Sequence, residues 1–447
     1  MSITLTDNSV RTFQYQDVKA LRPIAGKSIE QLCNENSNLL IFPDVIKNSR
    51  DKVEELPIFN FGIADDPEQI KLETGNAMGF IGIDNLKIKI KSRFDQGRDD
   101  YLLHYMLQRV LSFNMFDLNH NNEQEDVFDF IMFMFPFFLK NAVRQGLYRE
   151  YQTYKHNDAN VKGPIDIARH IVRNMPFIGR IAYTTREYSY DNNMTELIRH
   201  TIEFMKTKKY GQAVLKMDSE TIENVGTIIE HTPLYNKNER NSIISKNLRM
   251  KIHPYYTEYR PLQTLCLQIL RMEEIKYGDS DDLITGILFD GAWLWEEYIN
   301  TVLPVGALIH AENKKGLSGK PIFLFNGRQG PRYPDFYKKG DIVLDAKYKK
   351  LGNYERVSEV NRDDVHQVIT YMHILKAKKG GFIAPLENKQ ENVPTSQLWE
   401  SDESMSIYGI EICKHAKTYS EFCEQMKKNE QTFVRSLKLE SYSGNEL

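Results

Sequence analysis

The chain of 447 residues is 41% hydrophobic and 11% aromatic, which is enough apolar material for roughly two to four folded domains and excludes general disorder. Its formal net charge of −3 excludes a whole-chain basic excess as the basis of nucleic-acid binding. The four cysteines form no CxxC pair, so the sequence predicts reduced thiols rather than a zinc site or a disulfide scaffold.

Residues 1–118 are predicted to form an N-terminal domain of mixed β/α type. Segments 38–46 and 80–94 alternate apolar and polar residues, which is typical of half-buried strands, with a turn inside the second segment. Segment 100–113 has helical spacing. The polar cluster 117–126 predicts a linker.

Residues 119–262 are predicted to be mainly helical, because apolar residues recur at three- and four-residue intervals. The most apolar run, 127–139, is shorter than the stretch of about 20 residues that spans a bilayer. The N-terminal end shows no signal-peptide pattern. The sequence therefore predicts a soluble, cytoplasmic protein without a membrane segment.

Residues 263–447 change their hydrophobic period and predict an α/β domain with a central mixed sheet, so that the whole chain is a multidomain α+β protein. An amphipathic helix over 290–303 ends at Pro304. The further elements are expected in this order: strands over 305–312, 321–326, 332–337 and 341–348, a helix over 362–378, strands over 381–386 and 405–412, and a helix over 420–437.

A charged hairpin is expected where the sequence reads YPDFYKKGDIVLDAKYKK. Alternate residues of a strand share a face, so Asp345 and Lys347 project together near the end of the second strand. The apolar residues of this strand lie on the other face, which is expected to pack against a helix. The tight turn between the two strands returns Asp335 to the side of Asp345.

Two carboxylates and an ammonium gathered at one point suit the hydrolysis of a phosphodiester. Mg²⁺ prefers oxygen ligands, offsets charge on the phosphate and activates water. Asp335 and Asp345 are the predicted ligands, with the carbonyl of Ala346 as a third. Lys347 is predicted to orient or deprotonate the water, and also to stabilise developing charge on the phosphate. A solvated, charged hairpin is the alternative, because acid-x-Lys triplets also occur elsewhere in the chain.

Two flanking helices supply further candidates. Glu296 or Glu297 on the upstream helix is expected to complete the metal shell, although either is also an ordinary helix-surface acid. Gln367 and Tyr371 are spaced i, i+4 on the downstream helix, where they either contact the scissile phosphate or sit at a polar helix boundary. Between residues 314 and 350 there are ten basic residues against three acids, a local net charge of +7 that suits DNA.

A nucleotide site is not predicted. Gly26, Lys27 and Ser28 resemble the end of a phosphate-binding loop, but Leu21 stands where the first glycine belongs and no clear strand precedes it. The chain is therefore expected to bind no nucleotide itself.

The candidate site resembles the PD-(D/E)xK nuclease superfamily. The resemblance rests on Pro334-Asp335, Asp345-Ala346-Lys347, an acid on the upstream helix and Gln367 on the downstream helix. More narrowly, the chain is similar to the McrC-type nuclease subunits of McrBC-like modification-dependent restriction systems. The segments that carry this narrower resemblance are 161–174, 288–299, 345–349 and 364–372.

This resemblance extends roughly from Phe80 to Pro385, and the first 75 residues show none. Glu296 takes the place of the family's helix glutamate, with Trp295 where the family has Phe. Pro164 departs from a position that is often basic in the family.

The resemblance implies the Mg²⁺-dependent DNA endonuclease subunit of a GTP-driven restriction complex that targets methylated DNA. Such a subunit binds and stimulates a hexameric AAA+ GTPase of the McrB type, which recognises the DNA and translocates. The N-terminal domain, here 1–118, is then expected to contact the ring, and the endonuclease domain, here 263–447, to cut double-stranded DNA. Two alternatives stay open: a regulatory or scaffold subunit with a vestigial nuclease site, and a stand-alone structure-specific DNA nuclease.

Overall fold

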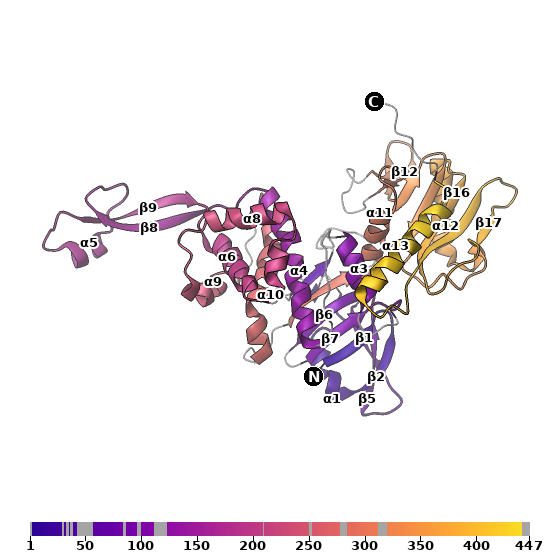
Figure 1. Cartoon of the computed structure of the whole chain (residues 1–447), viewed down its shortest axis with the longest axis horizontal. Coiled ribbons are helices and arrows are strands. Elements are labelled where there is room, and N and C mark those ends of the chain that lie inside the picture. The colour runs from indigo at the N-terminus through magenta and orange to yellow at the C-terminus, as the bar shows by residue number, and fades with distance from the viewer. Residues whose placement is uncertain are drawn as a thin grey trace. The chain divides into compact units, whose positions relative to one another are not determined.

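The structure, a computed structural model, describes residues 2–28, 31–32, 35, 39–42, 57–83, 86–95, 100–110, 123–208, 210–249, 253–277, 284–311 and 320–439. It is a mixed α/β protein, as the sequence predicts. The chain divides into two compact units, the first formed by Met1–Glu123 together with Ser280–Leu447 and the second by Gln124–Asp279 (Figure 1). The ends of the chain, which the sequence analysis assigns to separate domains, therefore share one unit.

A five-stranded sheet in the first unit combines strands from distant parts of the chain. Its order is β1–β7–β6–β10–β3, with the bounds Ser2–Thr6 (β1), Leu39–Phe42 (β3), Ala77–Ile83 (β6), Leu86–Lys91 (β7) and Ile284–Asp290 (β10). Strand β10, which the sequence analysis did not predict, runs antiparallel to β6 and parallel to β3. Gly79 permits the close approach of β6 to β10, because its φ is +132° and a Cβ there would lie 2.1 Å from the carbonyl oxygen of Ile287.

A smaller sheet and short helices complete the N-terminal segment. They are β2 (Val10–Gln14), β4 (Phe59–Ile63) and β5 (Gln69–Thr74) in the order β2–β5–β4, with α1 (Tyr15–Val18), η1 (Lys19–Leu21) and α3 (Tyr101–Val110). The strands predicted within 80–94 and the helix predicted over 100–113 correspond to β6, β7 and α3. The expected turn residues 84 and 85, and residues 117–122 of the expected linker, lie outside the described residues.

A six-stranded mixed sheet forms the C-terminal part of the first unit. Its order is β11–β14–β15–β16–β18–β17, with the bounds Ile309–His310 (β11), Phe336–Lys338 (β14), Ile342–Ala346 (β15), Lys379–Leu386 (β16), Thr395–Gln397 (β17) and Ser404–Glu411 (β18). Strand β14 is antiparallel to β15, whereas β15, β16 and β18 are mutually parallel. The other elements of this part are α11 (Gly291–Val302), the hairpin β12 (Ile322–Phe325) and β13 (Gln329–Arg332), η6 (Val357–Glu359), α12 (Arg362–Leu375) and α13 (Tyr419–Ser436).

The second unit is mainly helical, as predicted, but it also carries a two-stranded ribbon. Its helices are α4 (Glu123–Arg144), α5 (Ile167–Asn174), α6 (Asn193–Lys206), α7 (Gly211–Leu215), α8 (Ser219–Glu230), η4 (Lys237–Glu239), α9 (Arg240–Lys246) and α10 (Tyr259–Tyr277). The ribbon pairs β8 (Glu150–Asp158) with β9 (Ile181–Ser189) in antiparallel fashion and has α5 at its far end (Figure 1). No helix in the described part of the chain is long and apolar enough to cross a membrane.

The far end of the ribbon exposes a group of apolar side chains, called the apolar tip below. Its members are Val161, Ile165, Ile167, Ile171, Val172, Met175, Phe177 and Ile178, each between 39% and 84% exposed. The backbone beneath them is well fixed, because Asp166 caps α5 by accepting from the Arg169 N–H, and the Arg169 guanidinium donates to the Tyr183 carbonyl. Exposed apolar surface gathered in this way is typical of a protein contact site.

Helix α11 is joined to the C-terminal sheet by Trp295. Its indole is fully buried, and its N–H donates to the carbonyl of Ile383 in β16 at 3.0 Å. Trp295→Phe removes this donor and leaves a smaller ring in a packed core, so we expect the free energy of unfolding to fall by about 1–3 kcal/mol. Urea unfolding of the variant checks this value.

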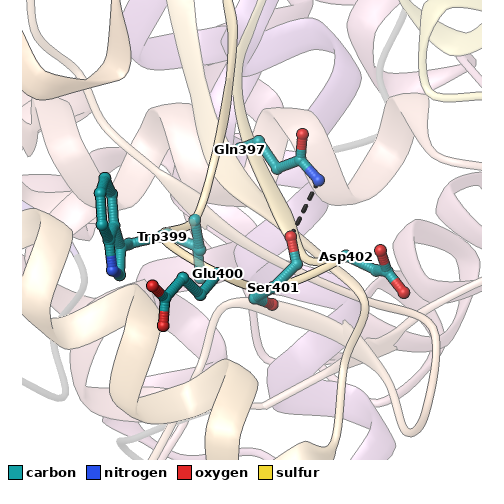
Figure 2. Close-up of a pocket in the computed structure, with 6 residues that line it drawn as sticks. Gln397, Trp399, Glu400, Ser401 and Asp402 are labelled. Carbon is teal, nitrogen blue, oxygen red and sulfur yellow. Dashed lines mark hydrogen bonds between the residues drawn. The ribbon is translucent and has the colours of Figure 1, made fainter.

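The matched control for Trp295→Phe is the same substitution at Trp399. That side chain is 89% exposed on the loop after β17, where Figure 2 shows it beside Glu400. We expect the control to change the free energy of unfolding by less than about 0.5 kcal/mol. Equal effects of the two substitutions would contradict a structural role for the buried indole.

Candidate active site

The charged hairpin predicted from the sequence is formed by β14 and β15. Phe336 pairs with Leu344 in the antiparallel register, which places Asp335 and Asp345 at the next opposed positions. Asp335 Oδ2 accepts a hydrogen bond of 2.6 Å from the backbone N–H of Ala346. An extended residue turns its N–H and C=O to the same side, so we expect the Ala346 carbonyl also to face the β14 side.

Lys347 lies between two carboxylates. Its Nζ is 2.8 Å from Asp345 Oδ2 and 3.2 Å from Asp364 Oδ1. Asp364, in the first turn of α12, also pairs through its other oxygen with Lys349 at 2.6 Å. Strand end and helix start are therefore joined by alternating positive and negative charges.

Strand β15 is covered on both faces, whereas the sequence analysis expects helix packing only on the apolar face. On the face of Asp345, Val343 packs in an apolar cluster with Val368 and Met372 of α12. On the other face, the ring of Tyr348 lies 6.3 Å from that of Trp295. The reason is that a helix lies on each face of β15, α12 on the face of Asp345 and α11 on the other.

Glu296 and Glu297 lie on the upstream helix α11. His310 of β11 links them to the hairpin. His310 Nε2 lies 3.8 Å from a carboxylate oxygen of each. Its Nδ1 is 2.9 Å from the carbonyl oxygen of Asp335, which can only accept, so Nδ1 carries the proton. Although burial favours the neutral imidazole, hydrogen bonding to Glu297 and Asp335 raises the pKa of His310. The imidazole thus acts as a bridge between the helix acids and the hairpin.

Gln367 does not contact the hairpin carboxylates directly. Its side-chain amide donates to the hydroxyl of Tyr371 at 2.9 Å. Burial raises the pKa of Tyr371, and the charges of Asp345 and Asp335 raise it further. Gln367 and Tyr371 therefore form one polar pair on α12, with Tyr371 the member within electrostatic reach of the carboxylates.

The carboxylates repel one another and are withdrawn from water. Burial raises the pKa of Asp335 well above its usual range, and the nearby charges of Glu296 and Asp345 add to this effect. Burial also raises the pKa of Asp345, although Lys347 opposes the shift. For Lys347, burial favours the neutral amine, but Asp345, Asp364 and Asp335 together raise its pKa, so the side chain stays an ammonium.

The donor set suits a hard divalent cation. Within the described residues, no three acid, histidine or cysteine side chains surround a single point at coordination distance. Asp335, Asp345 and Glu296 nevertheless interact strongly enough to raise the pKa of Asp335, and a divalent cation relieves that repulsion. Carboxylate and carbonyl oxygens are the ligands that Mg²⁺ prefers, so the residues present fit this ion.

Part of the local basic charge is neutralised by acids that lie beyond residue 350. Lys349 pairs with Asp364, and Lys350 pairs with Glu387 at 2.6 Å. Four other basic residues of this stretch are exposed: Lys320, Arg328, Arg332 and Lys339. Lys314 and Lys315 lie outside the described residues. The positive surface is therefore smaller than the residue count predicts.

Two residues that the structure brings to the site, Asp364 and His310, are not predicted from the sequence. Asp364 lies three residues before Gln367 and seven before Tyr371, so helical spacing alone places it on their face. His310 has no comparable signal, because its place depends on the pairing of β11 with β14.

Most of the chain is similar to one restriction-system family. The family model described as "McrBC 5-methylcytosine restriction system component" matches residues 72–385. A solved structure, the refined half-complex of Thermococcus gammatolerans McrB AAA+ hexamers with bound McrC, includes a chain that is 16% identical, with a TM-score of 0.50 over 96% of this chain and 100% of that chain. A chain in the T. gammatolerans McrBC complex is 14% identical over 68% of this chain and 87% of its own, with a TM-score of 0.32. Among curated proteins, none is significantly similar.

Proposed function

Because this chain belongs to the McrBC 5-methylcytosine restriction system component family, we propose that it is the DNA-cutting subunit of a GTP-driven restriction complex. In this proposal it hydrolyses phosphodiester bonds of methylated double-stranded DNA in the presence of Mg²⁺. It also stimulates a partner AAA+ GTPase, and it binds no nucleotide itself.

The observation that carries the proposal is the junction of β14, β15 and α12. There Asp335 and Asp345 stand opposite one another, with the Lys347 ammonium 2.8 Å from Asp345. Asp335, Asp345, Glu296 and the Ala346 carbonyl would hold Mg²⁺, which supplies charge neutralisation at the phosphate and an activated water. Glu297 is the alternative helix ligand, because His310 lies equally far from both glutamates.

The surroundings of Lys347 favour one of its two expected roles. Asp345 and Asp364 hold the side chain as an ammonium and raise its pKa. An ammonium donates hydrogen bonds and cannot accept a proton. We therefore assign Lys347 to binding a phosphate oxygen and stabilising its developing charge, rather than to removing a proton from water.

A protein partner is supported by the apolar tip of the second unit. The structurally similar chain from T. gammatolerans belongs to an assembly described as McrB AAA+ hexamers with bound McrC. We propose that this chain likewise binds a hexameric AAA+ GTPase and that the apolar tip makes part of the contact, since solvent-exposed residues such as Val172 and Phe177 gain from burial. The predicted contact through the N-terminal domain stays a second prediction.

The hairpin β12–β13 supports a contact with DNA near the site. It exposes both Arg328 and Phe325, the latter to 65%. Arg332, at its base, lies close enough to influence Tyr371 electrostatically. Guanidinium groups bind phosphate oxygens, so the hairpin suits a DNA backbone that runs past the carboxylates.

A cleavage assay with the complete system tests the proposal. The full chain is mixed with a McrB-type GTPase, GTP, Mg²⁺ and a DNA duplex that carries or lacks 5-methylcytosine. We expect cleavage of the methylated duplex only, complete dependence on GTP, and loss of cleavage when a chelator removes Mg²⁺.

The same assay separates the alternatives when GTP hydrolysis is followed in parallel. Stimulated GTP hydrolysis without cleavage supports a scaffold subunit with a vestigial site. Cleavage without partner or GTP supports a stand-alone nuclease. The absence of both DNA cleavage and GTPase stimulation contradicts the proposed function.

A further inference from the structure

The residue that follows Lys347 is anchored by the N-terminal sheet. The hydroxyl of Tyr348 lies 2.6 Å from Ser92 Oγ, and its ring is edge-on to that of Phe94 at 5.0 Å. The side chain is buried, and it packs so closely on Gly291 that a Cβ there would lie only 2.8 Å from its ring. Ser92 and Phe94 come directly after β7, more than 250 residues before Tyr348 in the chain.

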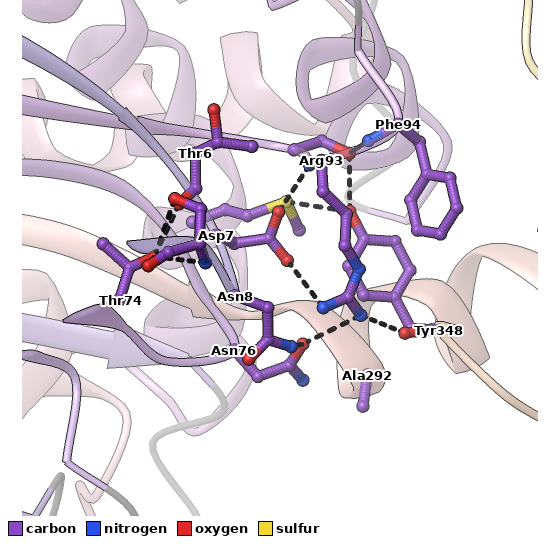
Figure 3. A network of polar contacts seen from close by, with 12 residues as sticks. Thr6, Asp7, Asn8, Thr74, Asn76, Arg93, Phe94, Ala292 and Tyr348 are labelled. Carbon is purple, nitrogen blue, oxygen red and sulfur yellow. Dashed lines mark hydrogen bonds and ion pairs between the residues drawn. The ribbon is translucent and has the colours of Figure 1, made fainter. Parts of the chain in front are cut away.

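Arg93, which lies between Ser92 and Phe94 in the chain, contacts the backbone next to Lys347. Its guanidinium donates to the carbonyl oxygen of Tyr348 and lies 4.7 Å from the centre of the Tyr348 ring (Figure 3). The main chain at Lys347 is held from the opposite direction, because its N–H donates to the Ile383 carbonyl of β16 at 2.9 Å. Two consecutive residues of the main chain are therefore held, Lys347 by its N–H to the sheet and Tyr348 by its carbonyl to the Arg93 side chain.

Arg93 is itself held by buried polar groups of the N-terminal segment. Asp7, which is fully buried, lies 3.5 Å from the guanidinium and accepts the backbone N–H of Arg93. The guanidinium also lies 3.5 Å from Asn76 Oδ1, as Figure 3 shows. The main-chain carbonyl of Asn76 accepts a hydrogen bond of 2.8 Å from the N–H of Gly291. Gly291 is the first residue of α11, the helix that carries Glu296.

We propose that Arg93, oriented by Asp7, is a positioning residue for the nuclease reaction: it fixes the main chain at Tyr348 and thereby the ammonium of Lys347 at the metal-binding carboxylates. This inference rests on the proposed function of the site. In this role Arg93 acts through the main chain of Tyr348, the residue that follows Lys347. The N-terminal sheet thus takes part in building the active site.

The geometry of the guanidinium explains why an arginine is needed. One face of its planar fork meets the Tyr348 ring while separate N–H groups reach the Tyr348 carbonyl and Asp7. A lysine at this position keeps the positive charge beside Asp7. Its ammonium has no planar group that contacts the Tyr348 carbonyl, Asp7 and the Tyr348 ring at the same time. Arg93→Lys is therefore the variant that separates positioning from charge.

The experiment measures cleavage and local backbone protection in the same variants. In the full complex, we expect Arg93→Lys to lower the single-turnover cleavage rate at saturating DNA by about 10- to 100-fold with unchanged DNA affinity. Hydrogen exchange of the free chain is expected to be faster in the peptide around residues 347–351, where several amide protons are hydrogen-bonded, and unchanged elsewhere. Asp7→Asn is expected to lower the cleavage rate and to speed exchange around residues 347–351 in the same way, but by smaller amounts. This variant replaces Arg93→Lys in the test if Arg93→Lys does not fold.

Arg11→Lys is the matched control, because Arg11 donates to the Thr4 carbonyl at 3.2 Å in the same N-terminal segment, away from the nuclease motif. It should change neither readout. Unchanged cleavage and exchange in Arg93→Lys would overturn the inference, and so would a uniform rise in exchange across the chain that accounts for the lost activity. If the wild-type complex does not cut, the proposed function fails, while the exchange measurement still reports whether Arg93 holds the segment.

Discussion

Asp345→Asn is expected to lower Mg²⁺-dependent DNA cleavage by at least about 100-fold, because metal ligation by a carboxylate is worth several kcal/mol of transition-state stabilisation. The substitution keeps the shape of a side chain that is only 3% exposed but removes its charge. It also removes the ion-pair partner of Lys347 at 2.8 Å. The measurement is the initial rate of duplex cleavage in the complete system with partner and GTP.

Asp341→Asn provides the control for this result. Asp341 lies four residues earlier in the same hairpin and pairs with Lys338 at 3.3 Å near the surface, away from the site carboxylates. We expect it to cut like the wild type. Asp345→Asn should still stimulate the partner's GTP hydrolysis, which shows that the complex assembles. Wild-type cleavage by Asp345→Asn would remove the metal site from consideration.

Two acidic substitutions in the apolar tip are expected to abolish the stimulation of the partner GTPase. Ile171 and Val172 of α5 are 55% and 84% exposed, so Ile171→Asp with Val172→Asp leaves the core of the second unit intact. In a contact with the ring, each charged side chain is buried without a partner. Loss of two central apolar contacts weakens binding by about 4 kcal/mol, which is roughly a thousandfold in affinity.

The measurement is the partner's GTPase rate as a function of the concentration of this chain. Ile222→Asp on α8 is the matched control, because Ile222 is 52% exposed in the same unit but lies outside the apolar tip. Wild-type stimulation by the doubly substituted chain would assign the ring contact elsewhere, with the N-terminal domain as the next candidate. Unfolding temperatures of all variants should agree with that of the wild type.

The local geometry of the candidate site followed from the sequence, because it depends on neighbours in the chain. Strand alternation places Asp345 and Lys347 together, and a tight turn returns Asp335 to them. Helical spacing likewise pairs Gln367 with Tyr371. These relations are set by backbone periods of two and 3.6 residues, which a sequence displays directly.

Features that depend on distant pairing could not be predicted in this way. Strand β10 reads as an ordinary apolar run, and its place between β6 and β3 is decided by contacts across some 200 residues. His310 and Arg93 reach the site only through such contacts. The ribbon β8–β9 is missed for another reason: most of its residues are partly or fully exposed, so its strands carry polar residues where a half-buried strand has apolar ones.

The position of β10 affects the order in which parts of the chain fold during synthesis. The N-terminal sheet lacks an interior strand until the ribosome has made residues 284–290, and those residues lead directly into the helix that carries Glu296. Domains generally fold as units during synthesis, and pairing between distant strands is slow. The helical second unit is therefore expected to fold first, and the candidate site is expected to form only after α11, β14, β15 and α12 have been synthesised. A chain truncated before residue 284 then contains the ribbon β8–β9 but neither β10 nor the helices and strands of the candidate site.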